Sequence, residues 1–245
     1  MTILANELRI NQSITNVTLI QVADRRITRG GKFDSNRRKV FEIPYLKASV
    51  GYFGLAHPTS REYFSSWLPN VIRHGHDIKT VKEFSGYLTD ELNKNVTKSF
   101  LKTNPSGFHL CGLAEDGIPE FYFIRNIDLD RMEGAYYKGF KDAYSCSEDF
   151  RNRDAITTND GKKRPLSSLQ NCIFWYVNGD LRSFWAFWMP ATQFIDSISM
   201  DPQFPALKSD LERAKWKLTV IAQLYGKYAK QKIVGGPIDG IEIKP

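Results

Sequence analysis

Residues 2–24 read TILANELRINQSITNVTLIQVAD, and this stretch decides the fold that the sequence predicts. Two runs rich in apolar and β-branched residues, 2–10 and 17–24, are separated by the polar turn cluster 11–13. Two such runs across a short polar turn are typical of an antiparallel hairpin. The chain therefore opens with two strands, and the second ends on a carboxylate, Asp24.

Further strand patterns follow at short intervals. A Gly30-Gly31 turn precedes a strand expected around 38–43, and another is expected at 47–53 after Pro44. Four strands in the first 55 residues, joined by short turns, favour an antiparallel sheet.

The next part of the chain has helical patterns. Residues 58–75 look helical in part, and Pro69 is expected to kink or end that helix. Residues 80–102 carry an apolar stripe at helical spacing, which we interpret as a core-facing side. A capping box at 209–212 predicts the start of a further helix.

The remaining segments alternate between strand and polar patterns. In chain order these are a strand pair at 107–114 and 120–127, a polar excursion at 142–170, an aromatic strand at 173–177, an aromatic segment at 181–198 broken by Pro190, and a last strand through Ile243. No linker stands out. We expect residues 1–245 to form one α+β domain, with an inserted or extended region around 142–205.

The composition excludes several classes of protein. Hydrophobic residues make up 42% and aromatic residues 13% of the 245 residues, which is typical of a globular chain rather than a disordered one. No run of 18 apolar residues predicts a membrane span. No secretory signal is recognised, so we expect a cytoplasmic protein.

The net charge of +7 raises the question of nucleic-acid binding. Basic runs occur at 25–26, 37–39 and 162–164, but no recognised binding module accompanies them. We interpret them as solvated surface. Nucleic-acid binding remains an alternative that rests on charge alone.

Neither the cysteines nor the histidines predict a metal centre. The three cysteines are widely spaced without a C-x-x-C pair, and the His74-Gly75-His76 pair has no carboxylate cluster beside it. We predict no metal and no cofactor.

Thr2 directly follows Met1 and is the first candidate catalytic residue. Removal of Met1 would leave a hydroxyl and a free α-amine on one residue. An α-amine has an ordinary pKa of about 7.7–8.0, so it can act as the base for its own hydroxyl. The simpler interpretation is the ordinary start of a strand.

Asp24 and Lys39 join Thr2 in one hypothesis. If the first hairpin turns near Ser13, Thr2 lies opposite Asp24, and Lys39 on the neighbouring strand contacts both. The ammonium would stabilise a developing alkoxide on Thr2, while Asp24 holds it in place. A strand-end ion pair without catalytic purpose is the competing interpretation.

The D-x-R-x-T segment at 24–28 and the Lys39-Val40 strand start complete a pattern. Residues 2–56 resemble the opening of the proteasome β-subunits and their bacterial relatives, among the N-terminal nucleophile (Ntn) hydrolases. The closing segment 233–239 is similar to the last strand of the bacterial members. The resemblance implies a four-layer αββα sandwich and a proteasome-like threonine peptidase that acts through an acyl-enzyme on Thr2.

The resemblance also implies residue roles. Thr2 would be nucleophile and base, with Asp24 and Lys39 as its supporting charges. Arg26 would be a structural neighbour and Thr28 would align the substrate. Gly54 would stand at the oxyanion hole and also contact substrate.

The departures from the family pattern keep a second function open. The family's supporting serine has no clear match near 138–140, and its aspartate and serine at the end of the last helix correspond to Gln231 and Val234. A catalytically inactive structural or binding subunit is therefore the alternative. The partners implied are a peptide or protein substrate, further copies of the chain in a homo-oligomer such as a ring, and an ATP-dependent unfoldase.

Overall fold

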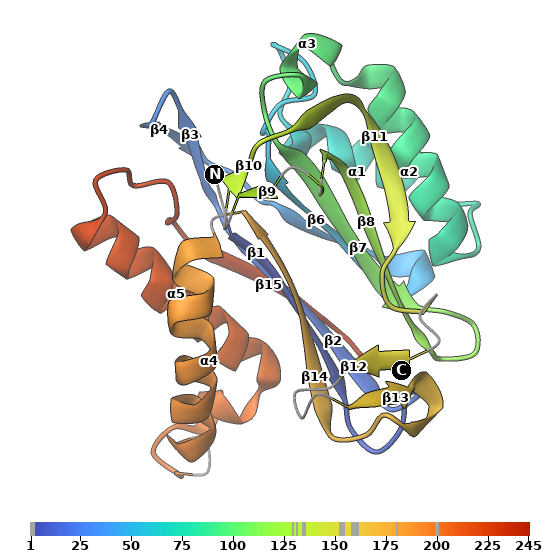
Figure 1. Cartoon of the computed structure of the whole chain (residues 1–245), viewed down its shortest axis with the longest axis vertical. Coiled ribbons are helices and arrows are strands. Elements are labelled where there is room, and N and C mark those ends of the chain that lie inside the picture. The colour runs from blue at the N-terminus through green and yellow to red at the C-terminus, as the bar shows by residue number, and fades with distance from the viewer. Residues whose placement is uncertain are drawn as a thin grey trace.

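The computed structural model describes residues 3–128, 130, 132–133, 136–151, 155–157, 162–179, 181–198 and 201–245. Two antiparallel sheets lie face to face in the centre, and helices cover the outer face of each (Figure 1). The structure is therefore mixed α+β, as the strand and helix patterns predict.

One sheet has four strands in the order β14-β1-β2-β15. Their bounds are β1 (Ile3–Ile10), β2 (Val17–Asp24), β14 (Cys172–Gly179) and β15 (Ile238–Ile243). Every residue of β2 is buried, because the strand is covered on both faces. The predicted first hairpin and the predicted last strand are confirmed.

The register of this hairpin differs from the expected one. Leu4 pairs with Ala23, so the loop is centred between Ser13 and Ile14 rather than on Ser13. The reason is the loop's own hydrogen bonding, in which the Asn11 N–H donates to the Asn16 carbonyl at 3.0 Å. Continued by one residue, this register puts Ile3 opposite Asp24. Thr2 lies outside the described residues, so its expected place opposite Asp24 stays a prediction.

The other sheet has five strands in the order β11-β8-β7-β6-β5. Their bounds are β5 (Val40–Ile43), β6 (Ala48–Gly54), β7 (Ser106–Leu113), β8 (Pro119–Ile127) and β11 (Phe140–Glu148). Three smaller pairs are β3 (Arg26–Arg29) with β4 (Lys32–Asn36), β9 (Met132–Glu133) with β10 (Tyr136–Tyr137), and β12 (Ala155–Thr157) with β13 (Lys163–Pro165). The β3–β4 hairpin projects beyond the two sheets (Figure 1).

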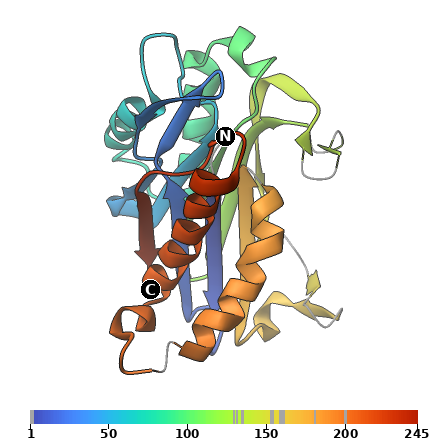
Figure 2. The same cartoon turned by 90° about the vertical axis from the view of Figure 1, so that its left-hand side faces the viewer.

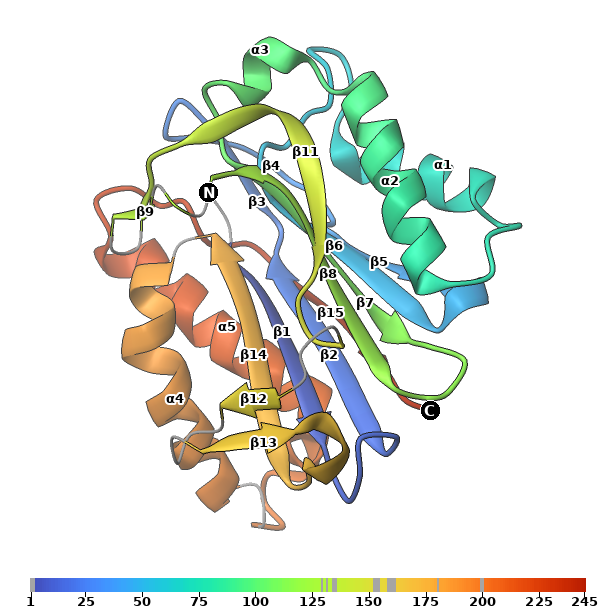
Figure 3. The same ribbon diagram turned by 45° about the vertical axis from the view of Figure 1, so that its right-hand side comes forward.

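Parts of the region around 142–205 belong to the two main sheets, whereas β12 and β13 pair only with each other among the described residues. Most of β11 falls in the predicted polar excursion, yet it pairs with β8 as an edge strand (Figure 3). It reads as a loop because most of its side chains face solvent. Further along, β14 pairs with β1 over its whole length.

Five α-helices are present among the described residues. Their bounds are α1 (Phe64–His74), α2 (Val81–Asn95), α3 (Lys98–Leu101), α4 (Leu181–Ile198) and α5 (Asp210–Tyr228), and short 3₁₀ turns lie at Pro44–Leu46, Leu166–Ser168 and Pro205–Lys208. Figure 2 shows α4 and α5 lying across the outer face of the four-stranded sheet. No helix in the described part of the chain is both long and apolar enough to cross a membrane.

Two prolines lie inside helices instead of ending them. Pro69 is internal to α1, and Pro190 is internal to α4. A proline removes one hydrogen bond from a helix. In α1 the buried side chains of Trp67 and Leu68 pack against the sheet, and this burial offsets the loss. The expected break at Pro190 is wrong.

The capping box is confirmed, since the Glu212 N–H donates to Ser209 Oγ at 3.4 Å.

Three apolar clusters hold the layers together. One lies between α1, α2 and the five-stranded sheet, one lies between the two sheets, and one lies between the four-stranded sheet and α4 and α5. The order of layers is therefore helices, sheet, sheet, helices.

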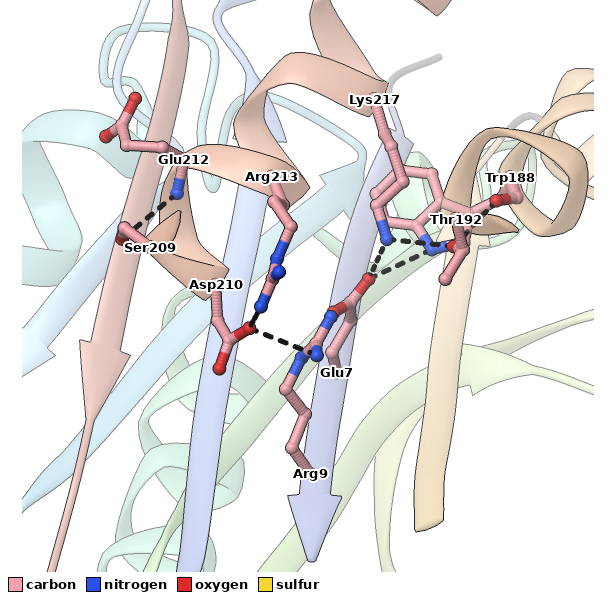
Figure 4. Close-up of polar contacts among 9 residues, drawn as sticks. All are labelled: Glu7, Arg9, Trp188, Thr192, Ser209, Asp210, Glu212, Arg213 and Lys217. Atoms are coloured by element: carbon pink, nitrogen blue, oxygen red, sulfur yellow. Dashed lines mark hydrogen bonds and ion pairs between the residues drawn. The ribbon is translucent and has the colours of Figure 1, made fainter. Parts of the chain in front are cut away.

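A buried charge cluster fastens α4 and α5 to β1 (Figure 4). Glu7 accepts a hydrogen bond from Lys217, and both side chains are 1% exposed. Trp188 Nε1 also donates to Glu7 at 3.1 Å, and Arg9 donates to it at 2.7 Å. Burial opposes the charged carboxylate, but Lys217 and Arg9 outweigh this effect and lower the pKa of Glu7.

Candidate functional site

Asp24 and Lys39 form a buried ion pair at one end of the sandwich. Asp24 ends β2 and Lys39 immediately precedes β5. Lys39 Nζ lies 3.6 Å from Asp24 Oδ2, and the two side chains are 2% and 0% exposed. The ammonium also donates to the Arg26 carbonyl at 2.7 Å. The structure thus brings together two of the predicted charged residues.

Asp24 also accepts hydrogen bonds from three backbone N–H groups. Oδ1 accepts from Ile3 at 3.0 Å, and Oδ2 accepts from Arg26 at 3.2 Å and from Gly235 at 3.1 Å. One carboxylate therefore holds the start of β1, the chain after β2 and the glycine pair before β15. Thr2 itself lies outside the described residues.

Burial changes the proton affinity of Lys39. Loss of solvent lowers the pKa of the ammonium, and the nearby charges of Asp24 and Asp239 raise it. The effect of burial is the larger, so the pKa lies below the ordinary 10.5. Lys39 gives up a proton more readily than an exposed lysine does.

A pocket of about 240 Å³ opens beside this pair. Lys39 and Tyr52 are buried and form its floor, whereas Arg29 and Gly30 are exposed and form its rim. Thr28 lines the wall. The pocket has space for a substrate side chain next to the Lys39 ammonium.

Gly54 lines the same pocket and cannot be replaced without strain. Its φ of +82° lies in the left-handed region, which other residues rarely adopt. A Cβ atom at this position would lie 2.0 Å from the Pro105 carbonyl oxygen. Only glycine lets the end of β6 approach the chain before β7 this closely.

The contacts of Arg26 hold neighbouring segments of the chain together. Its guanidinium lies over the Phe33 ring, 5.0 Å from the centroid, and its backbone makes the contacts to Asp24 and Lys39 already described. Arg26 N also donates to the Gly235 carbonyl at 3.0 Å. Arg26 therefore joins the β3–β4 hairpin to the segment before β15.

The positions that depart from the family pattern offer no replacement group. Val234 is fully buried in the apolar cluster under α5, and Gln231 is exposed. Lys138 is exposed as well. These three positions supply neither a serine nor an aspartate to the pocket.

Sequence reasoning missed several residues that line the pocket, among them Arg29, Tyr52, His57 and Asn104. The Tyr52 hydroxyl donates to the Arg38 carbonyl at 3.2 Å, and burial raises the pKa of this phenol. His57 comes three residues after Gly54, and this short spacing could have indicated that it lies near the pocket. Asn104 lies in the turn before β7, and no sequence motif indicates its place in the pocket.

No protein-family model matches this chain, and no curated protein is significantly similar to it.

Proposed function

We propose that this protein is an N-terminal threonine amidohydrolase with the Ntn-hydrolase fold, a proteasome-like peptidase that acts through Thr2 after removal of Met1. One observation carries the proposal. Lys39 lies on the floor of a pocket and is paired with the buried Asp24, which accepts a hydrogen bond from the N–H of Ile3, the residue that follows Thr2.

The reaction would proceed through an ester. The Thr2 hydroxyl oxygen attacks the carbonyl carbon of the scissile amide, and its proton passes to the Thr2 α-amine. Collapse of the tetrahedral intermediate breaks the C–N bond, and the ammonium returns the proton to the leaving amine. A water molecule, deprotonated by the α-amine, then hydrolyses the ester and regenerates the hydroxyl.

Lys39 would assist the first step. An ammonium beside the hydroxyl stabilises negative charge on the oxygen, and a lowered pKa favours proton exchange with it. Asp24 would keep Lys39 in position, since its carboxylate is itself fixed by three backbone donors.

Gly54 would stabilise the tetrahedral intermediate through its backbone N–H. One such donor contributes about 3–4 kcal/mol in known hydrolases. The left-handed conformation and the close approach to Pro105 fix this peptide in one orientation, which supports a preorganised donor. Thr28 on the pocket wall would align the substrate backbone.

The order of layers supports the fold assignment. Two antiparallel sheets packed between helical layers are what the four-layer αββα sandwich of the Ntn hydrolases requires. A ring-like homo-oligomer and an ATP-dependent unfoldase belong to the same proposal as expected partners.

A catalytically inactive structural or binding subunit is the second candidate. The observation that favours it is Val234, an apolar and fully buried side chain where the family has a serine. This candidate predicts assembly without hydrolysis.

One experiment separates the enzyme from the inactive subunit. It measures hydrolysis of a mixed set of fluorogenic peptides by the wild type, Thr2→Ala and Lys39→Ala. Peptidase activity that both substitutions abolish supports the enzyme. Lys32→Ala, which removes an exposed cation, is the matched control and keeps the activity. A wild type that assembles and cleaves nothing supports the inactive subunit.

A further inference from the structure

The lining of the pocket carries positive charge. Among the lining residues that the structure describes, Arg26, Arg29 and Lys39 are cationic and none is an aspartate or glutamate. Arg26 lies over Phe33, and Lys39 is paired with Asp24. Arg29 is exposed, and no described carboxylate lies within ion-pair distance of it.

Asp34, whose carboxylate feels the charge of Arg29, is already engaged in hydrogen bonds. Asp34 accepts hydrogen bonds from the Tyr63 hydroxyl at 2.8 Å and from Ser35 Oγ at 3.0 Å. These bonds lower the pKa of Asp34, and the charge of Arg29 adds to the effect from a longer range. Asp34 does not line the pocket and leaves the guanidinium of Arg29 available.

His57 holds Arg29 at the rim. The His57 Nδ1–H donates to the Glu62 carbonyl at 3.1 Å, which leaves the lone pair on Nε2. A guanidinium nitrogen of Arg29 lies 3.2 Å from Nε2 and donates to it. A guanidinium has five N–H donors, so several remain for a ligand.

Further contacts support the His57 ring. Its ring lies against Tyr63 at a tilt of 39° with the centroids 4.0 Å apart, and the Arg37 guanidinium lies over the Tyr63 ring at 4.2 Å. Together with the Tyr63–Asp34 hydrogen bond, these contacts clamp the β3–β4 hairpin onto the segment after β6. The cation is therefore held in place before a ligand arrives, which reduces the entropy lost on binding.

We propose that this pocket selects substrates with an acidic side chain on the acyl side of the scissile bond. Arg29 binds the carboxylate, and His57 is the positioning residue that orients Arg29. The inference rests on the proposed function. A planar guanidinium matches a carboxylate through two parallel hydrogen bonds, and a charge in a specificity pocket selects the opposite charge on the substrate.

The test compares fluorogenic peptides acetyl-Ala-Ala-Xaa-aminomethylcoumarin, with glutamate, glutamine, leucine or lysine as Xaa. Glutamate and glutamine have the same shape, so their ratio isolates the charge. We expect kcat/KM for glutamate to exceed that for glutamine about tenfold, as hydrogen bonds to a charged group predict. Arg29→Gln brings the ratio close to one.

Lys32→Gln is the matched control. Lys32 pairs with Arg29 across the β3–β4 hairpin and carries the same charge, but it does not line the pocket. This variant keeps the glutamate preference. Equal rates for glutamate and glutamine in the wild type, a preference that survives Arg29→Gln, or an equal loss in Lys32→Gln would each overturn the inference.

Binding gives a readout that does not require hydrolysis. Calorimetry with the Thr2→Ala protein compares acetyl-Ala-Ala-Glu-amide with its glutamine counterpart. Tighter binding of the acidic peptide without any wild-type hydrolysis contradicts the proposed function and supports the acidic pocket. Hydrolysis that depends on Thr2 but shows no acidic preference, with equal binding of both peptides, supports the proposed function and contradicts the acidic pocket. Absence of both hydrolysis and binding contradicts both.

Discussion

The Lys39 ammonium and the Asp24 carboxylate lie 3.6 Å apart, and neither side chain is more than 2% exposed. At this burial neither charge is compensated by water, so each depends on the other. The same carboxylate accepts a hydrogen bond from the Ile3 N–H at 3.0 Å. The pair thereby connects the beginning of the chain to the floor of the pocket.

Asp24→Ala should destabilise the fold by about 3–5 kcal/mol, because it leaves the buried Lys39 ammonium without its carboxylate and removes the acceptor that the Ile3 and Gly235 N–H groups share. Urea unfolding followed by circular dichroism measures the loss. The control is Asp142→Ala, which removes an exposed ion pair with Lys102 and should cost less than about 1 kcal/mol. Equal losses in the two variants would contradict the buried pair.

Lys39 should titrate below the ordinary lysine pKa of 10.5. Because the Asp24 charge raises the pKa of Lys39, Asp24→Asn should lower it further. The chemical shift of the Lys39 Cε, followed against pH by NMR in both proteins, gives the two values. A pKa that rises or stays constant in Asp24→Asn would rule out this coupling.

Gly54→Ala should destabilise the protein by at least about 1–3 kcal/mol, since a residue with a side chain is strained at positive φ. The clash with the Pro105 carbonyl adds to this cost. Gly86→Ala is the matched control, because Gly86 lies inside α2 with nothing within 4 Å of an added Cβ. Alanine there should stabilise the helix by about 0.5–1 kcal/mol. Thermal unfolding compares the two, and a harmless Gly54→Ala would show that the peptide is not constrained.

Lys217→Met should cost about 3–5 kcal/mol of stability, because it leaves the Glu7 carboxylate buried without its ammonium partner. Lys215→Met, two residues earlier on α5, removes only the partly exposed pair with Glu212 and should cost about 0.5 kcal/mol. Urea unfolding measures both variants. A loss below 1 kcal/mol in Lys217→Met would mean that Glu7 is satisfied by Arg9 and Trp188 alone.

The first hairpin shows what a sequence pattern can predict and what it cannot. The alternation of apolar and polar runs predicts β1 and β2 correctly, because both strands are built from β-branched and apolar residues. It does not predict their register, which depends on the hydrogen bond between Asn11 and Asn16. The observed register is shifted by one residue from the expected one, and the Ile3 N–H bonds to Asp24.

Elements that depend on tertiary contacts were harder to predict. An exposed edge strand such as β11 has the composition of a loop, and only its pairing with β8 makes it a strand. Pro190 suggests the end of a helix, whereas α4 continues through it.

The candidate site was predicted in part. Asp24, Lys39, Thr28 and Gly54 belong to short motifs near the start of the chain, so their spacing could be recognised. Tyr52 and His57 join the pocket only because β6 and the segment after it fold beside the β3–β4 hairpin.

The most direct test of the account is the site that a peptide β-lactone acylates. Tandem mass spectrometry of the natively expressed protein should find a chain that starts at Thr2 and carries one ester on the Thr2 hydroxyl. Lys39→Ala should lack this adduct. A chain that retains Met1 without an adduct, or an adduct on another residue that persists in Thr2→Ala, would contradict the enzyme.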